Sequence, residues 1–114
     1  MAKLPNAENA IIDAEKLQDY VLSSSHPIGR FKAAFFRQMG YSAGDWQMFE
    51  LHLRQQILTR EVIKVEETHH GQKFVIEGPM TGPAGKTMQI VTVWVILKGV
   101  GIPRFVTAYP GGLL

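Results

Sequence analysis

The sequence predicts an α+β domain in which three N-terminal helices pack on one face of a four-stranded antiparallel meander sheet. Two observations lead to this prediction. Apolar residues recur at a helical period up to about residue 58, and the pattern changes to the shorter period of β-strands after Arg60. Stretches rich in glycine and proline then separate four apolar segments. Helices followed by strands in this order are typical of the α+β class.

The first helix is expected over roughly residues 14–23, after an extended lead-in at residues 4–7. Asp13 is placed to cap this helix, and Leu17, Tyr20 and Val21 form one apolar stripe along it. The run Ser23-Ser24-Ser25-His26-Pro27 follows. We expect this run to end the helix, because proline and clustered serines interrupt helical periodicity.

Two further helices are expected before the sheet. One runs from about residue 29 to residue 39, where Gly40 is a natural stop. The other ends near residue 58, and Ser42 followed by Asp45 resembles a capping box at its start. Its predicted inner face consists of Trp46, Phe49, Leu53 and Ile57.

Four strands are predicted in the second half of the chain, over residues 62–67, 73–77, 88–97 and 104–109. Turns are expected at residues 69–72, 81–86 and 99–103. The third strand is apolar on both faces, so we expect it to be central and covered. The chain of 114 residues has room for one compact core, which predicts a single domain over residues 1–114.

A lysine lies on the expected buried side of the second helix. At 100° per residue, Phe31, Phe35, Phe36 and Met39 form one apolar arc, and the arc contains Lys32. Arg30, Ala33 and Arg37 are expected on the opposite, solvent-facing side. Because desolvating a cation is costly, Lys32 either extends its ammonium to the surface or binds an anionic substrate.

Composition excludes several classes of protein. The chain has 46% hydrophobic and 19% charged residues, as ordinary globular domains have, and it contains no cysteine for disulfides or thiolate chemistry. No apolar run is long enough for a membrane span, so we expect no membrane partner. The residues fit a cytoplasmic protein, or a domain delivered to the cytoplasm of a target cell as part of a larger toxin. The net charge of +2 is small, but residues 26–60 alone carry a net +3, enough to hold one or two phosphates.

Motifs for nucleotide, zinc-protease or serine-hydrolase chemistry are absent from the sequence. His69 and His70 are adjacent in an expected turn, so a joint metal site there is improbable, and neighbouring Glu66 and Glu67 point to opposite faces of a strand. We therefore expect neither a metal nor another cofactor.

A set of polar residues remains as the candidate site. The proposed catalytic residues are His26, Lys32, Arg104 and Thr107, and the proposed substrate-binding residues are Arg30, Lys73 and Tyr109. By the period of two, Thr107 and Tyr109 are expected to share a face with Phe105. Arg104 would lie on the other face unless the strand start is bulged. Each of these residues also has a purely structural explanation, and only the combination points to catalysis.

The chemistry that this set suggests is metal-independent cleavage of RNA, through attack by a 2′-OH that gives a 2′,3′-cyclic phosphate. A histidine suits proton transfer because imidazole ordinarily titrates near pH 6.5. Lys32, Arg104 and Thr107 would hold the phosphoryl oxygens, where negative charge develops. Tyr109 could stack on a base.

Several segments resemble a small bacterial family of unknown function, which occurs as free-standing proteins and as C-terminal domains of polymorphic toxins. The segments are Leu4-Pro5-Asn6-Ala7, His26-Pro27-x-Gly29-Arg30-x-Lys32-Ala33, Gly71-Gln72-Lys73-Phe74-Val75, Thr81-Gly82-Pro83-x-Gly85, Val93-Trp94-Val95-Ile96 and residues 103–110. The predicted fold also resembles the barnase–EndoU–colicin–RelE superfold of metal-independent ribonucleases. By that resemblance His26, Lys32 and Thr107 match catalytic positions best, although no second histidine or glutamate is evident as their partner.

Two functions follow as hypotheses. The first is an endoribonuclease-like toxin domain acting on tRNA or mRNA. The second is a non-catalytic interaction module that binds a cognate protein, as a neutralising partner or as an inhibitor in a toxin or phage-defence system. The sequence leaves the enzyme question and the oligomeric state open.

Overall fold

The computed structural model describes residues 2–23, 25–26 and 29–111. Its order of elements is the α+β order that the sequence predicts, with the helices first and the sheet last. The helical elements are η1 (Ala7–Asn9), α1 (Ala14–Lys16), η2 (Leu17–Val21), α2 (Gly29–Gln38), η3 (Ala43–Asp45), α3 (Trp46–His52) and η4 (Leu53–Ile57). α1 continues directly into η2, and α3 into η4, so that each pair forms one helical rod.

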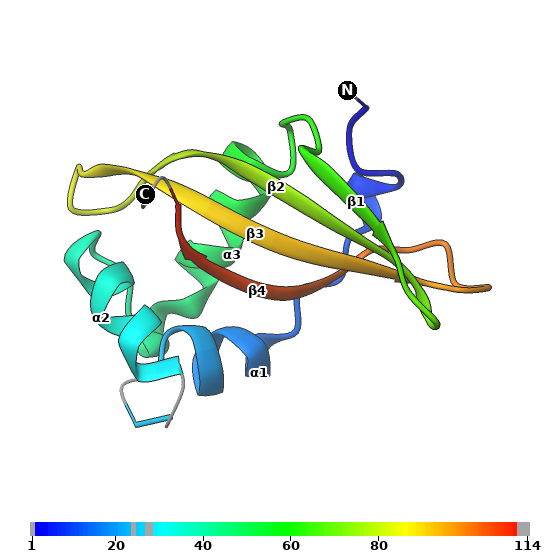
Figure 1. Cartoon of the computed structure of the whole chain (residues 1–114). Helices are drawn as coiled ribbons and strands as arrows, with labels where there is room; N and C mark the ends of the chain where they lie inside the picture. Colours follow the sequence, from blue (N-terminus) through cyan, green and yellow to red (C-terminus); the bar gives the residue numbers. More distant parts are fainter. Residues whose placement is uncertain (1, 24, 27–28, 112–114) are drawn as a thin grey trace.

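The sheet is an antiparallel meander with the strand order β1-β2-β3-β4. Its strands are β1 (Lys64–Glu67), β2 (Gly71–Thr81), β3 (Thr87–Leu97) and β4 (Arg104–Pro110). α3 lies behind the sheet, and α1 and α2 lie beside the edge formed by β4 (Figure 1). Within the described residues, this arrangement leaves the opposite face of the sheet without a helix packed on it.

The core lies between the helices and the inner face of the sheet. Trp94 is fully buried at its centre, on the central strand, and packs edge-on against Phe105. The indole Nε1 of Trp94 donates a hydrogen bond to Thr92 Oγ1 (2.8 Å), and that hydroxyl donates to the carbonyl of Ile76 (3.0 Å). These two linked hydrogen bonds satisfy the polar N–H group that the buried tryptophan brings into the core.

A β-bulge in β4 decides which of its side chains enter the core. Trp94 pairs with Phe105, but the preceding residue Val93 pairs with Thr107, so Val106 is an extra residue without a partner on β3. Directly paired residues point to the same face, and neighbours along a strand point to opposite faces. Phe105 therefore lies on the inner face, and Thr107 lies on the outer one.

The bulge corrects one expectation and resolves another. Strict alternation predicted that Thr107 and Tyr109 share a face with Phe105, and this prediction is wrong. The extra residue Val106 reverses the alternation and places both on the opposite face. Arg104 pairs with Val95, two residues from Val93, and so lies on the same outer face as Thr107. The sequence places Arg104 with Thr107 only if the strand is bulged near its start, and β4 has such a bulge.

Helix α2 differs from its predicted orientation. Phe36 and Met39 are fully buried as expected, but Phe31 is 68% exposed and Ala33, expected in solvent, is only 2% exposed. The physical reason is that α2 packs beside the β4 edge, and the side of its first turn that meets β4 carries Lys32 rather than Phe31. Lys32 is part-buried on the side facing β4.

Several element ends also differ from the predictions. Neither Asp13 nor Ser42 caps a helix through its side chain. β2 is longer than expected and runs to Thr81, while β1 begins only at Lys64. Arg60 packs against Gly78, where a Cβ would meet the arginine Cδ at 2.3 Å, so a glycine in the strand makes room for this side chain.

The turn between β2 and β3 holds the end of α2. Ala84 N donates to the carbonyl of Met39 (2.9 Å), and a Cβ on Gly82 would lie 2.3 Å from that same oxygen. Gly40 ends the helix with φ of 100°, a conformation that glycine adopts without strain. The C-terminal end of α2 is therefore fixed to the sheet.

We predict that Thr92→Val destabilises the fold although it preserves volume. The substitution leaves the buried Trp94 N–H without an acceptor, which costs about 1–3 kcal/mol in the free energy of unfolding. Urea denaturation followed by tryptophan fluorescence measures the change. Thr87→Val on the same strand is the matched control, because Thr87 is exposed and should change stability by less than about 0.5 kcal/mol. Equal unfolding midpoints for the two variants would contradict the prediction.

Candidate functional site

Lys32 forms the centre of a polar cluster between α2, η2 and β4. Its Nζ donates hydrogen bonds to Tyr20 Oη (2.7 Å) and Thr107 Oγ1 (2.9 Å). The ammonium also lies 4.7 Å from the centroid of the Tyr20 ring and 5.9 Å from that of Tyr109. Within the described residues no carboxylate lies within ion-pair distance of Lys32, so hydroxyls and aromatic faces surround its charge.

Tyr20 is the residue of this cluster that the sequence analysis missed as a functional group. The hydrogen bond from Lys32 lowers the pKa of Tyr20, partial burial opposes the shift, and the Thr107 hydroxyl adds a smaller lowering. The cause is stabilisation of the phenolate by the adjacent ammonium. Tyr20 was visible in the sequence only as part of an apolar stripe, and nothing there distinguished its hydroxyl from a surface one.

His26 lies next to Tyr20, at the end of the loop that follows η2. The two rings meet edge-on, with centroids 4.9 Å apart. The backbone N–H of His26 donates to Ser23 Oγ (3.2 Å), so the serine-rich stretch positions the histidine. Residues 24 and 27–28 of this loop lie outside the described residues, and so does the side chain of Arg30.

A cavity of about 630 Å³ opens beside the cluster. Tyr20, His26 and Thr107 contribute to its wall. The rest of the lining is Asp13, Glu15, Lys16, Asp19 and Val106. The lining of the cavity therefore combines hydroxyl and imidazole groups with three carboxylates and one ammonium.

Arg104 forms an ion pair with Asp13 rather than a contact with Lys32 or with the hydroxyls that Lys32 binds. Its guanidinium NH1 lies 2.9 Å from Asp13 Oδ2 and 3.1 Å from Oδ1. The backbone next to it is also fixed, because Phe105 N donates to the carbonyl of Ile11 (2.9 Å). Asp13, predicted as a helix cap, instead neutralises the arginine.

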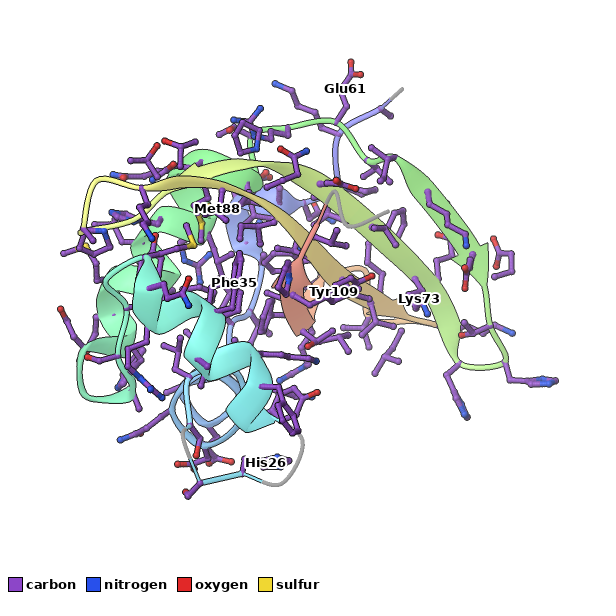
Figure 2. The ribbon with its side chains drawn as sticks, turned by 60° about the vertical axis from the view of Figure 1, so that its left-hand side comes forward. His26, Phe35, Glu61, Lys73, Met88 and Tyr109 are labelled. Atoms are coloured by element: carbon purple, nitrogen blue, oxygen red, sulfur yellow. The ribbon has the colours of Figure 1, made fainter. Side chains whose placement is uncertain are left out.

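Lys73 and Tyr109 lie on the outer face of the sheet, but at different distances from the cluster. Tyr109 borders it through its contact with Lys32. Lys73 is on β2, separated from Arg104 by β3, and its ammonium lies 3.6 Å from a Glu66 oxygen. Figure 2 shows His26 and Lys73 at different ends of the molecule. The structure thus brings together His26, Lys32, Thr107 and Tyr109, whereas Lys73 does not join them.

Two other kinds of site have no candidate in the described part of the chain. No group of three or more histidine, aspartate or glutamate side chains there could hold a metal ion. No helix there is long and apolar enough to cross a bilayer.

We predict that Lys32→Met raises the pKa of Tyr20 toward the ordinary tyrosine value of about 10, because the ammonium no longer stabilises the phenolate. A pH titration of ¹³Cζ-labelled tyrosine by NMR, with Tyr20→Phe to assign the resonance, measures the shift. Lys16→Met is the matched control and should shift this pKa less, since Lys16 contributes the weakest of the lowering effects. An unchanged Tyr20 titration in Lys32→Met would contradict the hydrogen bond between Lys32 and Tyr20.

A comparison with solved structures found a similar fold. The neighbour is a chain of a "Contact-dependent growth inhibition toxin - immunity protein complex from Klebsiella pneumoniae 342", with a TM-score of 0.61 and 21% identity. The match covers 88% of this chain and 98% of that one. At this identity the likeness concerns the fold alone. No curated protein sequence matches the chain.

A comparison with family models gave a match over almost the entire chain. The model is that of DUF6883, described as a domain of unknown function, and it matches residues 3–112. The resemblance to a family of unknown function, expected from the sequence motifs, is therefore confirmed, whereas the ribonuclease superfold stays a prediction. The chain belongs to the DUF6883 family.

Proposed function

We propose that this domain is a metal-independent endoribonuclease of a toxin system. The observation that carries the proposal is the Lys32 ammonium held between the hydroxyls of Tyr20 and Thr107, two residues that line a cavity together with His26. An ammonium has three N–H donors, and two are used by Tyr20 and Thr107. The remaining donor and the full charge are available for a phosphoryl oxygen.

The fold similarity to a chain of a toxin–immunity complex supports a toxin-related or immunity-type role in general. The polar cluster supports the catalytic alternative in particular. An RNA substrate would place the site of action in the cytoplasm of a target cell.

The proposed reaction transfers the phosphoryl group within the RNA chain. The 2′-oxygen attacks the adjacent phosphorus, and the His26 imidazole accepts the proton of the 2′-OH. The bond from phosphorus to the 5′-oxygen breaks, and Tyr20 donates its phenolic proton to that leaving oxygen. The products are a 2′,3′-cyclic phosphate and a 5′-OH end, so no oxidant, metal or water is consumed in this step.

Lys32 has two roles in this proposal. Its charge stabilises the phosphorane, on which negative charge builds up in the transition state. It also stabilises the Tyr20 phenolate left after proton donation, as the lowered pKa of Tyr20 indicates. Thr107 orients the ammonium and can donate its own hydroxyl proton to a phosphoryl oxygen. Tyr20 would thus be the partner acid that the sequence analysis lacked.

Arg104 has a lesser role than the sequence predicted. Because its guanidinium is paired with Asp13, a phosphate would have to compete with a carboxylate for it. We assign Arg104 to positioning α1 against β4 rather than to the reacting atoms.

We predict that the purified protein cleaves total tRNA or mRNA in the presence of EDTA and leaves 2′,3′-cyclic phosphate ends. His26→Ala and Tyr20→Phe should each lower kcat by about 10²–10⁴, because each removes a proton-transfer group. Lys32→Met should lower kcat by about 10²–10³ through the loss of charge stabilisation. Single-turnover cleavage of labelled RNA measures these changes.

Lys86→Met, in the exposed turn between β2 and β3, is the control for loss of a positive charge and should cleave like the wild type. Circular dichroism verifies that each variant is folded. If the wild type leaves all RNA intact at micromolar concentration, the catalytic proposal is wrong.

One observation favours the second function, a protein-interaction module. Phe31, predicted for the core, is 68% exposed next to Lys32. A large exposed aromatic residue near a functional cluster is a common anchor in protein interfaces. A neutralising partner that covers Phe31 would at the same time block access to Lys32.

The two functions predict different effects of expression in a bacterial host. An active ribonuclease should arrest growth, and Lys32→Met should relieve the arrest while Phe31→Ala should not. Growth curves after induction, with protein levels compared by immunoblot, measure the difference. Equal, harmless accumulation of wild type and Lys32→Met would favour the interaction module.

A further inference from the structure

Side chains of four strands meet on the outer face of the sheet, which the helices leave uncovered. The strand register places Glu66, Lys73, Val95 and Arg104 in one row across β1 to β4. It places Lys64, Val75, Val93 and Thr107 in the next row. The third row contains Glu77, Val91 and Tyr109. Figure 2 labels Lys73 and Tyr109.

Valines occupy the middle of this face, and we call Val91 and Val93 the valine floor. Val91 and Val93 are each 7% exposed, yet neither belongs to the hydrophobic cluster between sheet and helices. Since no described helix covers them, the neighbouring side chains and, for Val91, the backbone at Gly111 provide the cover. If the side chains that cover them moved aside, these valines would offer an apolar surface to a base or sugar.

The border on β1 and β2 carries excess positive charge. Lys64 and Lys73 share the single carboxylate of Glu66, at 2.7 and 3.6 Å. Both lysines are exposed, by 62% and 42%, and ion pairs this exposed are weak. Either ammonium can therefore exchange the carboxylate for a phosphate at little cost. Glu77, the other acid on this face, lies at its far end, where Gly111 packs close to it.

The charges around the Lys32 cluster differ on its two sides. On the cavity side, Glu15 and Asp19 line the wall and would repel a polyanion. On the sheet side, the Tyr109 ring lies next to the Lys32 ammonium. The Glu66 carboxylate raises the pKa of Lys64, and Tyr109 adds a smaller effect in the same direction. Thr107 belongs to both sides, because it lines the cavity and lies on the outer face.

We propose that the outer face of the sheet binds single-stranded RNA, with a base stacked on Tyr109 and flanking phosphates on Lys64 and Lys73. The inference rests on the proposed ribonuclease function and names the path of its substrate. The RNA runs from Lys32 across the valine floor toward β1, away from the carboxylates that line the cavity. Unpaired bases are required, because a duplex would not offer a base face to Tyr109.

The test is binding of a fluorescently labelled, fully 2′-O-methylated oligonucleotide, which keeps the phosphates but lacks the attacking 2′-OH. Fluorescence anisotropy gives Kd over a range of salt concentrations. In the double variant Lys64→Ala/Lys73→Ala, the slope of log K against log salt should fall in magnitude by about 1.4, since each phosphate contact on a single strand contributes about 0.7. Tyr109→Ala should weaken binding by about fivefold or more.

The matched control is Lys3→Ala/Lys86→Ala, which removes the same charge from exposed positions outside the outer face. Its salt slope should equal that of the wild type. The proposal is overturned if the two double variants have the same slope and affinity, or if the wild type does not bind the oligonucleotide. A duplex of the same sequence that binds as tightly as the single strand would also overturn it.

This test separates the RNA path from the catalytic proposal, because the probe cannot be cleaved. Cleavage of a dinucleotide, too short to reach Lys64 or Lys73, reports on the catalytic cluster. Dinucleotide cleavage without face-dependent binding of the oligonucleotide would refute the RNA path and leave the catalytic proposal intact. Face-dependent binding without any cleavage would refute the catalytic proposal alone.

Discussion

The β-bulge at Val106 is the constraint on which the arrangement of the site depends. It sends Phe105 into the core against Trp94 and sends Thr107, two residues later, to the opposite face. Without the extra residue, strict alternation would place Thr107 with Phe105 on the inner face, where its hydroxyl could not meet a cation from α2. The bulge therefore lets one edge strand serve the core and the polar cluster at once, a use of bulges that is common near functional sites.

The position of Lys32 depends on contacts at both ends of α2. At the C-terminal end, the Met39 carbonyl accepts a hydrogen bond from Ala84, and the absence of a side chain on Gly82 permits the close approach. At the N-terminal end, Lys32 bonds to Tyr20 and Thr107. Because a helix is stiff, fixing its far end to the sheet limits how far the ammonium can move relative to β4. Rigid placement of this kind suits a group that stabilises charge in a transition state.

The sequence predicted the fold class and strand order well because these follow from hydrophobic period and turn residues. It also identified Lys32 as a cation on an inward side, since helical geometry alone gives that result. It could not predict the bulge, because Val106 is an ordinary strand former without the glycine that often marks such a site. It misplaced Phe31 and Ala33 because a helical wheel shows which residues share a side, but not which side meets the sheet. Tyr20 was missed because its function depends on a lysine and a threonine 12 and 87 residues away along the chain.

The charges around the Lys32 cluster are distributed unevenly, with carboxylates in the cavity and lysines on the outer face of the sheet. Glu15 and Asp19 line the cavity next to the cluster, together with Asp13, whose carboxylate is already paired with Arg104. On the other side, two exposed lysines share one glutamate across a valine floor. A single small anion would respond only weakly to this difference, whereas a chain of phosphates would follow it, because each added charge increases the preference for the basic side. The asymmetry therefore supports the proposed RNA path, because an extended polyanion gains more from the basic side than a small phosphorylated metabolite would.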